Sequence, residues 1–389
     1  MKISDVKLKE IIYYASMCMY IVFMTLTQTM YFPYFRGSIY LIVVFIIICG
    51  VYCKESLSLL LGKDGVSGIL YLTIALVLSY IVGGEALATT VALILTTRDM
   101  NLKKAIKFGM YVLVFILFFV IFSAKLGIIS NYSIMRGGHI REYLGFRYSL
   151  YPAAILFNIV ASYIYVYYKR VKLTFLFFLL LATLYIYVCT YAKLSTILII
   201  FLICIGILDK YIDIFKNKFL LRIINILKYS YIFLPILSLW VTYNYKQSIN
   251  WMHKLDLFLE TRLSLAKTSL DLYGIKLFGI KNLAWQGNGL SIDGSVVKNN
   301  NYLYVDNFYI NILQQHGMIF SILLLLLLTL VTIRAKRSGD NFLTFILIIF
   351  SFHGLIDNLM LTLYYNIFLL AITPYVFMKN NKSNSEDKK

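Results

Sequence analysis

Charged side chains are scarce in this sequence. They make up 14% of its 389 residues, whereas a soluble globular domain carries roughly a quarter. Hydrophobic residues make up 60% and are collected into apolar runs along nearly the whole chain. A run of about 20 apolar residues can cross a bilayer as a helix. The shortage of charge therefore argues against a soluble protein, and the sequence predicts an all-α, polytopic membrane protein with one domain over residues 1–389.

The signatures of metal and nucleotide chemistry are also missing. The five Cys lie in or beside apolar runs, and no two of them have metal-ligand spacing. Their odd number argues against a disulfide framework. The four His are scattered, and the sequence has no GxGxxG, Walker or HExxH pattern. We therefore expect neither a metal site nor a cofactor.

Charged or Gly-rich breaks divide the apolar runs into about twelve expected membrane spans. These spans are 11–30, 37–53, 66–83, 85–97, 106–127, 149–168, 172–191, 194–208, 229–245, 307–333, 341–356 and 358–378. The polar stretch after the last span, about 380–389, is expected to be a disordered tail.

Basic residues greatly outnumber acidic ones, and the formal net charge is +19. In a membrane protein such an excess first reports orientation, because cytoplasmic loops collect Lys and Arg. If the N-terminus is cytoplasmic, 24 of the 37 basic residues lie inside and 13 outside. The sequence therefore predicts that both termini are inside, and it gives no reason to expect a nucleic-acid partner. The basic, amphipathic stretch 209–228 would then lie on the inner leaflet among anionic lipids.

Two of the expected outer loops are long, about 128–148 and about 246–306, and with their flanks they hold most of the outer basic residues. The first loop and its end carry Arg136, Arg141 and Arg147. The planar guanidinium fork binds phosphate oxygens in pairs. A cluster of three beside glycines predicts a diphosphate site, and the alternative is that these side chains reach lipid headgroups.

The second outer loop has a helical pattern over 257–274, with one apolar face and Gly274 at the position of a C-cap. Arg262 and Lys267 lie off that face. We expect a short amphipathic helix on the membrane surface that presents these cations to a polar ligand. The alternative is a solvated face, which is the preferred interpretation of Lys267.

Two acids lie where membrane spans are expected to begin, Asp306 before the span at 307–333 and Asp357 before the last span. Ionisable groups at such depth are costly and usually face a polar cavity where they have a role. The alternative is that each carboxylate caps the N-terminus of a helix, where the helix dipole favours negative charge.

This order of parts resembles the bacterial O-antigen ligase and polysaccharide polymerase superfamily, which includes the Wzy-type polymerases. That family has ten to fourteen spans and a large late outer loop followed by a His/Asp-Asn-x-Tyr…Gly motif. The matching residues here are Asp306-Asn307-Phe308-Tyr309 and His316-Gly317.

Shorter family motifs also have counterparts upstream. They are a Gly-Arg or Ser-Arg step, a Leu-Phe-Gly, a Gly-x-Gly, and an Arg before a Gly-Phe turn. The matching residues are Thr261-Arg262, Leu277-Phe278-Gly279, Gly287-Asn288-Gly289, and Arg141 with Gly145-Phe146-Arg147. A Ser-Arg step at the start of a middle span is replaced by Ala192-Lys193, which keeps the charge and loses the fork.

The resemblance implies a metal-independent membrane glycosyltransferase at the outer face of the cytoplasmic membrane. Its donor is an oligosaccharide linked by diphosphate to undecaprenol, and its acceptor is a sugar hydroxyl on a second lipid-linked repeat unit. The product is a surface polysaccharide such as capsule, O-antigen or exopolysaccharide. Membrane lipids, a flippase and a chain-length regulator are the implied partners.

The resemblance also assigns roles to residues. The groups expected to bind the diphosphate are Arg136, Arg141, Arg147, Arg262 and Lys193. The group expected to accept the hydroxyl proton is Asp306 or His316. The remaining motif and loop residues are Asn307, Tyr309, Gly287, Gly289 and Asp357. Two alternatives stay open, a flippase for lipid-linked oligosaccharides and a ligase of the same superfamily.

The predicted orientation can be tested by cysteine labelling of intact cells with a reagent that cannot cross the membrane. We expect Ser295→Cys to react, because 246–306 should be outside, and Lys216→Cys to stay unlabelled until the cells are opened. Labelling of Lys216→Cys in intact cells, with Ser295→Cys silent, would invert the topology.

Overall fold

The computed structural model describes residues 3–60, 65–136, 138–287 and 302–377. The structure is 76% helical. Its helices and strands are α1 (Ile3–Leu26), α2 (Ser38–Leu60), α3 (Gly65–Leu95), α4 (Leu102–Lys125), β1 (Ser133–Arg136), β2 (His139–Glu142), α5 (Tyr151–Tyr167), α6 (Leu173–Thr190), α7 (Lys193–Ile212), α8 (Lys218–Leu227), α9 (Ser230–Tyr243), α10 (Asn250–Phe258), α11 (Arg262–Tyr273), α12 (Phe308–Gln315), α13 (Met318–Arg337), α14 (Asn341–His353) and α15 (Ile372–Phe377). The tail expected at 380–389 lies outside the described residues.

Long apolar helices form most of the bundle. Within the described ranges, six helices are long and apolar enough to cross a membrane, and α8 with α9, bent by 60°, is a seventh candidate. Large apolar side chains on these helices are exposed, among them Phe115 and Phe118 of α4 and Phe178 of α6. Water disfavours such surfaces and lipid does not. The expectation of an all-α, multi-pass membrane protein is thus confirmed.

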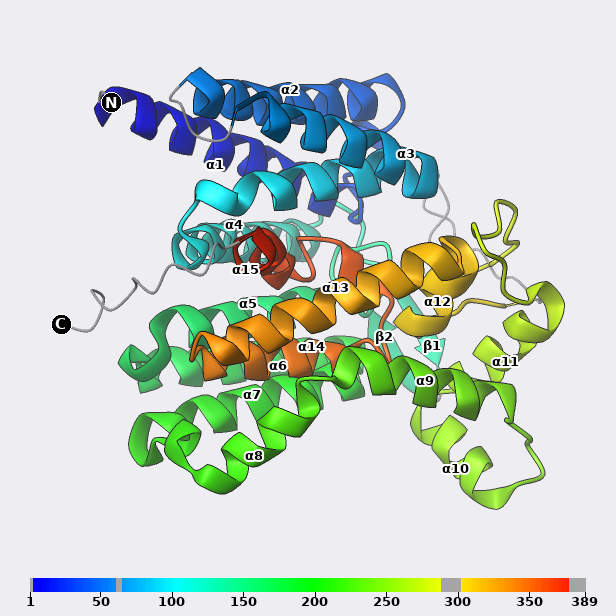
Figure 1. Ribbon diagram of the computed structural model, residues 1–389. Coiled ribbons are helices and arrows are strands. Elements are labelled where there is room, and N and C mark those ends of the chain that lie inside the picture. The colour runs from blue at the N-terminus through cyan, green and yellow to red at the C-terminus, as the bar shows by residue number, and fades with distance from the viewer. Residues whose placement is uncertain (1–2, 61–64, 137, 288–301, 378–389) are drawn as a thin grey trace.

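α5 is the central helix of the bundle (Figure 1). Every residue from Pro152 to Tyr165 is buried, because α4, α6, α7 and α14 pack around it. Its sequence is apolar on nearly all sides, which is typical of a helix without an exposed face. α10, α11, α12 and the two strands gather at one end of the bundle, and α8 lies at the other end (Figure 1).

α3 is two antiparallel helical legs joined at a sharp break. Gly83 and Gly84 have non-helical backbone angles, and Gly84 has φ 67° and ψ −162°. In a straight helix Gly68 and Arg98 would be about 45 Å apart. However, a Cβ atom built on Gly68 would lie 2.6 Å from Arg98 Nη2. The segment therefore folds back on itself, and its legs correspond to the two short spans expected on either side of the break.

A cluster of ion pairs joins the open end of this folded-back segment to α1 and α2. Lys9 Nζ lies 2.8 Å from Asp99 Oδ2, and Arg98 Nη2 lies 2.6 Å from Glu55 Oε2. The fully buried Lys54 side chain pairs with Glu55 at 2.7 Å. Breaking a buried pair leaves an uncompensated charge and is strongly destabilising, so the cluster fixes the end of α3 against its neighbours.

The chain is mostly irregular over 354–366, between α14 and the C-terminal helix. The buried Asn158 of α5 satisfies several backbone groups of this segment. Its Nδ2 donates to the carbonyls of Leu363 and Tyr364, and its Oδ1 accepts from the Ile367 N–H. Irregular backbone in a membrane bundle is tolerated only where protein groups satisfy it. This loop is what carries Asp357.

The structure differs from the expected elements in several places. The first of the two loops expected to be outside contains an antiparallel hairpin of β1 and β2, which the all-α prediction did not include. The helix expected over 257–274 is interrupted at residues 259–261, where α10 ends and α11 has not begun. The span expected at 307–333 is broken after α12, and the last span is largely irregular. The hairpin and the interruption between α10 and α11 are held by hydrogen bonds between residues close in sequence. The break after α12 and the irregular last segment are held by hydrogen bonds to distant residues, among them Lys276 and Asn158.

The fold-back of α3 predicts a strong requirement for glycine at position 84. Its backbone angles are accessible almost only to glycine, and we expect Gly84→Ala to destabilise the protein by about 1–3 kcal/mol. No atom lies within 4 Å of the new Cβ position, so the loss would report backbone strain alone. Thermal unfolding in detergent measures it. Val77→Ala, at an exposed site on the first leg, is the control. Equal melting temperatures for Gly84→Ala and the wild type would contradict the fold-back.

Candidate active site

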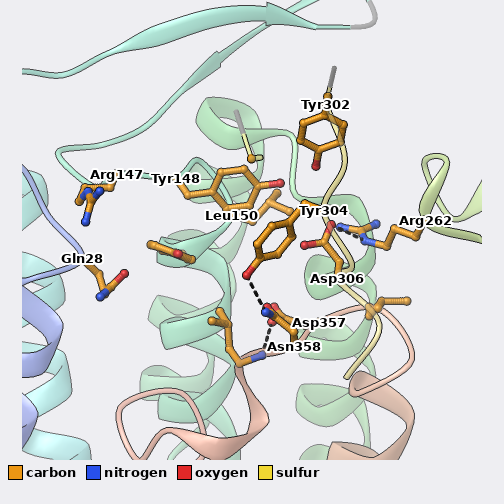
Figure 2. Close-up of a pocket in the computed structure, with 14 residues that line it drawn as sticks. Gln28, Arg147, Tyr148, Leu150, Arg262, Tyr302, Tyr304, Asp306, Asp357 and Asn358 are labelled. Carbon is orange, nitrogen blue, oxygen red and sulfur yellow. Dashed lines mark hydrogen bonds and ion pairs between the residues drawn. The ribbon is translucent and has the colours of Figure 1, made fainter. Parts of the chain in front are cut away.

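A polar cavity of about 240 Å³ lies where the start of α5, the segment before α12 and the loop after α14 meet. Side chains from distant parts of the chain line it (Figure 2), among them Gln28, Arg147, Tyr148, Tyr151, Arg262, Tyr302, Tyr304, Asp306, Asp357 and Asn358. Arg147 and Gln28 lie on one side, and Arg262 lies on the other, beyond Tyr148 and Tyr304 (Figure 2). The cavity therefore brings together two guanidinium groups and two carboxylates.

Arg262 is the first residue of α11, and Asp256 fixes that end of the helix. The Asp256 carboxylate accepts hydrogen bonds from the N–H groups of Leu263 (3.0 Å) and Ser264 (2.9 Å). These donors have no partner within the helix, and the helix dipole favours an acid there. The Arg262 side chain is only 9% exposed. The sequence placed Arg262 on the polar side of a surface helix, and the structure buries it beside the cavity.

Asp306 forms an ion pair with Arg262, with 3.3 Å between Oδ2 and Nε. Figure 2 shows the carboxylate facing the guanidinium group. The cap of α12 is the next residue, Asn307, whose Oδ1 accepts from the N–H groups of Tyr309 (3.1 Å) and Ile310 (3.2 Å). Helix capping therefore does not account for Asp306.

Asn307 also ties three elements together at the edge of the site. Its Nδ2 donates to Ser238 Oγ of α9 (2.9 Å) and to the carbonyl oxygen of Leu355 (3.1 Å) in the loop after α14. The same side chain thus caps α12 and holds both α9 and the Asp357 loop. The sequence motif gave Asn307 a place beside the site, and its function in the structure is positional.

Asp357 lines the cavity from the loop after α14. Its Oδ1 accepts from the Leu359 N–H at 2.9 Å, and its Oδ2 lies 3.9 Å from Nε2 of the buried His353. Burial raises the pKa of Asp357 to about 6, against the opposing effects of the Leu359 N–H and Arg262. The hydrogen bond from the Leu359 N–H lies in the irregular loop, so Asp357 does not cap the N-terminus of a membrane-spanning helix as the alternative expected. Its carboxylate lines the cavity, and a functional role for it stays a prediction.

The remaining cations surround Arg262 at different distances from the cavity. Arg147 lines it and stacks its guanidinium group 4.3 Å from the centre of the Phe32 ring. Arg141 lies behind, with Nη2 3.4 Å from Glu260 Oε2. Lys193 lines a small adjoining cavity together with Glu260, Arg262 and Asp357. Cations from both expected outer loops and from α7 are thus brought to one region, while Arg141 does not itself line the main cavity.

His316 does not line this cavity. Its Nδ1 lies 3.2 Å from the carbonyl oxygen of Val82, beside the break in α3. It ends α12 just before Gly317, where φ is 90°. A Cβ atom on Gly317 would lie 2.3 Å from the Gly279 nitrogen. The Leu-Phe-Gly and His-Gly motifs therefore pack against each other as backbone, and this contact accounts for their glycines.

The remaining residues expected at the site lie in different parts of the structure. Tyr309 is fully buried, and its hydroxyl group donates to the Ser351 carbonyl at 2.6 Å, so it packs in the core. Gly287 lines the cavity. Arg136 is the last residue of β1. Gly289 lies outside the described residues.

The sequence alone did not single out the aromatic wall of the cavity, because Tyr302 and Tyr304 could equally belong to a membrane-interface belt. Tyr148, Tyr151, Tyr302 and Tyr304 line it, and Tyr304 accepts at its hydroxyl oxygen from Asn358 Nδ2 at 2.8 Å. The chain has 33 Tyr, so composition could not single these out. Tyr302 and Tyr304 lie just before Asp306 in sequence, and that spacing was the one available signal.

An apolar groove of about 410 Å³ adjoins the cavity, with lining side chains from α7, α9, α10, α11 and α14. Leu, Ile, Val, Ala and Phe line it, with only Ser238, Thr242, Arg262 and Asn307 as polar members. Arg262 lines the groove, the polar cavity and the small adjoining cavity. A charged group at such a junction suits a ligand with an apolar tail and an anionic head.

The fold and the site together define a multi-pass, all-α membrane protein with a charged, tyrosine-lined cavity beside an apolar groove. Comparison with protein-family models, curated proteins and solved structures finds no match for this chain.

The position of Asn307 predicts that Asn307→Asp lowers the stability of the protein more than the same substitution at an ordinary helix cap. A carboxylate would still cap α12, but it could not donate to Ser238 and Leu355, and leaving these groups unsatisfied should cost about 1–3 kcal/mol. Asn217→Asp is the matched control, because Asn217 caps α8 at an exposed site and Asp caps about as well as Asn. Thermal unfolding in detergent compares the two. A similar change in melting temperature in both variants would contradict the bridging function of Asn307.

Proposed function

We propose that this protein polymerises undecaprenyl-diphosphate-linked oligosaccharide repeat units into surface polysaccharide. The reaction is a glycosyl transfer at the outer face of the cytoplasmic membrane. The growing glycan moves from its lipid diphosphate to a sugar hydroxyl on a new repeat unit, and undecaprenyl diphosphate leaves. The resemblance described above suggests this activity, and the geometry of the cavity and groove supports it.

The position of Arg262 at the junction of the two spaces carries the proposal. A lipid-linked glycan has an apolar chain, a diphosphate and a sugar in that order. The apolar groove suits the chain, Arg262 suits the diphosphate, and the polar cavity with its tyrosines suits the sugar. Aromatic rings beside polar groups pack well against sugar faces, because these faces are apolar and their edges form hydrogen bonds.

The charge at the site is arranged for a reaction that releases an anion. Among the described lining residues, Arg147 and Arg262 balance Asp306 and Asp357 before any ligand is present. Lys193 and Arg141 lie close by, and Glu260 pairs with Arg141. An arriving diphosphate competes with these carboxylates for the cations. Cations placed where charge grows stabilise the transition state of its departure.

The proposed orientation has twelve crossings and both termini in the cytoplasm. The pairs Lys9–Asp99 and Lys169–Asp213 join elements away from the cavity. Arg334 likewise donates to the carbonyl oxygens of Tyr375 and Val376 near the C-terminal end. α8 lies at the end of the bundle opposite α11 and α12 (Figure 1). This separation supports an inner side rich in Lys and Arg and an outer side that carries the cavity.

Replacing Arg262 with Lys tests the junction. Lys keeps the charge and loses the paired donors that match phosphate oxygens, so we expect polymer output to fall by roughly 100-fold. The measurement is the chain-length distribution of surface polysaccharide from cells whose own copy carries the variant. Lys267→Gln is the control on the same helix, because Lys267 pairs with Asp271 on the solvent side, and it should leave chain length unchanged.

The same cells separate the three candidate functions. If the protein is a polymerase, Arg262→Lys leaves single repeat units on the outer leaflet. Units trapped on the inner leaflet would indicate a flippase, and full-length polymer that stays on its lipid carrier would indicate a ligase. Normal chain length in Arg262→Lys would contradict a role for Arg262 in all three.

A further inference from the structure

We propose that Asp357, and not Asp306, accepts the proton of the acceptor hydroxyl, while Asp306 positions Arg262. This inference rests on the proposed glycosyl transfer. The sequence motif pointed to Asp306 or His316 as the base. The structure offers two carboxylates in one cavity in different environments, and the difference between these environments separates their roles.

Asp306 is committed to a cation. Its Oδ2 lies 3.3 Å from Arg262 Nε, and the Arg262 side chain is nearly buried. Accepting a proton would break this pair and leave a buried guanidinium group without its counter-charge, which is costly. The pair instead holds the guanidinium at the junction of the cavity and the groove. Asp306 is therefore a positioning residue that acts through Arg262.

Asp357 has the features of a proton acceptor. It lines both the main cavity and the small cavity that contains Lys193. One oxygen is held by the Leu359 N–H, which fixes the direction of the carboxylate. The other oxygen lies 3.9 Å from His353 Nε2. The carboxylate is thus oriented by the backbone, without an arginine as close as the one at Asp306.

Titratable groups from each neighbouring element face Asp357. Arg262 comes from α11, His353 from α14, Tyr304 from the segment before α12 and Tyr151 from α5.

Lys193 of α7 and Glu260 share the small cavity with Asp357. Burial outweighs the nearby positive charge and raises the pKa of Asp357 to about 6. A general base is most effective when its pKa is near the working pH, so this environment favours the same assignment as the geometry.

The acceptor hydroxyl gives its proton to an Asp357 oxygen as its own oxygen forms a bond to the anomeric carbon of the donor sugar. The bond from that carbon to the diphosphate oxygen breaks, and its electron pair leaves with undecaprenyl diphosphate. Arg262, Arg147 and Lys193 stabilise the charge on the leaving diphosphate. Asp357 then releases its proton to water.

Paired Asp→Asn variants test the assignment, with lipid-linked repeat units as substrate and undecaprenyl diphosphate as a binding probe. We expect Asp357→Asn to lower kcat by about 100-fold or more and to leave KM and probe binding nearly unchanged. Asp306→Asn should raise KM and weaken probe binding by about 10-fold while it keeps much of kcat. Asp271→Asn, an exposed carboxylate on α11, is the control and should match the wild type.

The pH dependence separates catalysis from structure. Below a pH of about 6 Asp357 holds its proton, so the wild-type rate should fall on the acid side. Asp306→Asn should keep this acid limb, Asp357→Asn should lose it, and Asp357→Glu should restore part of kcat. The raised pKa means that ionised Asp357 destabilises the fold at pH 7. The neutral Asn can still accept from Leu359, so the melting temperature of Asp357→Asn should be equal or higher.

Three results would overturn these assignments. Asp357→Asn within about threefold of the wild-type kcat removes Asp357 as the base. A 100-fold loss of kcat in Asp306→Asn with unchanged probe binding gives that role to Asp306. Wild-type protein that makes no polymer from lipid-linked units contradicts the proposed function itself, and this outcome is distinct from the other two.

Discussion

This structure depends on one constraint: where a helix breaks inside the apolar bundle, its backbone N–H and C=O groups must still find hydrogen-bond partners. Asn158 supplies partners for the irregular segment after α14, and Asn307 caps α12 while it holds Leu355. Gln314 donates to the carbonyls of Ser269 and Gly274 and so fastens α11 to α12. No water in the lipid could replace these donors. The buried amides therefore allow loops to enter the bundle, and those loops carry the site.

The site follows from these breaks. Asp357 reaches the cavity because the chain does not continue as a helix after His353. Asp306 reaches it because it lies just before Asn307, the N-cap of α12, and so stays outside the helix. Arg262 is brought in by the interruption between α10 and α11. A bundle of uninterrupted spans would place backbone carbonyls and N–H groups within helices and would offer no cavity of this kind. Its polar groups meet because three separate helices end at the same place.

The apolar groove and the polar cavity meet at the side chain of Arg262. Apolar side chains line most of the groove, and polar side chains line most of the cavity. A charge held beside apolar surface interacts more strongly with an anion than the same charge in water. The ion pair with Asp306 holds that guanidinium group in place. This combination suits a ligand that is partly lipid, partly phosphate and partly sugar.

The sequence by itself determined the membrane class, the helical content, and the region in which functional charge would be found. These follow from composition and from apolar runs, whose physical effect is local. It also picked out Asp306 and Asp357, because acids at the ends of spans are costly without a purpose. It picked out Arg147 and Arg262 because guanidinium groups in the two long expected outer loops suit a phosphate ligand. Tertiary structure alone decided that Asn307 bridges Ser238 and Leu355, that His316 contacts a backbone carbonyl, and that four tyrosines form one wall. Those outcomes depend on contacts between residues tens to hundreds of positions apart, which no local pattern contains.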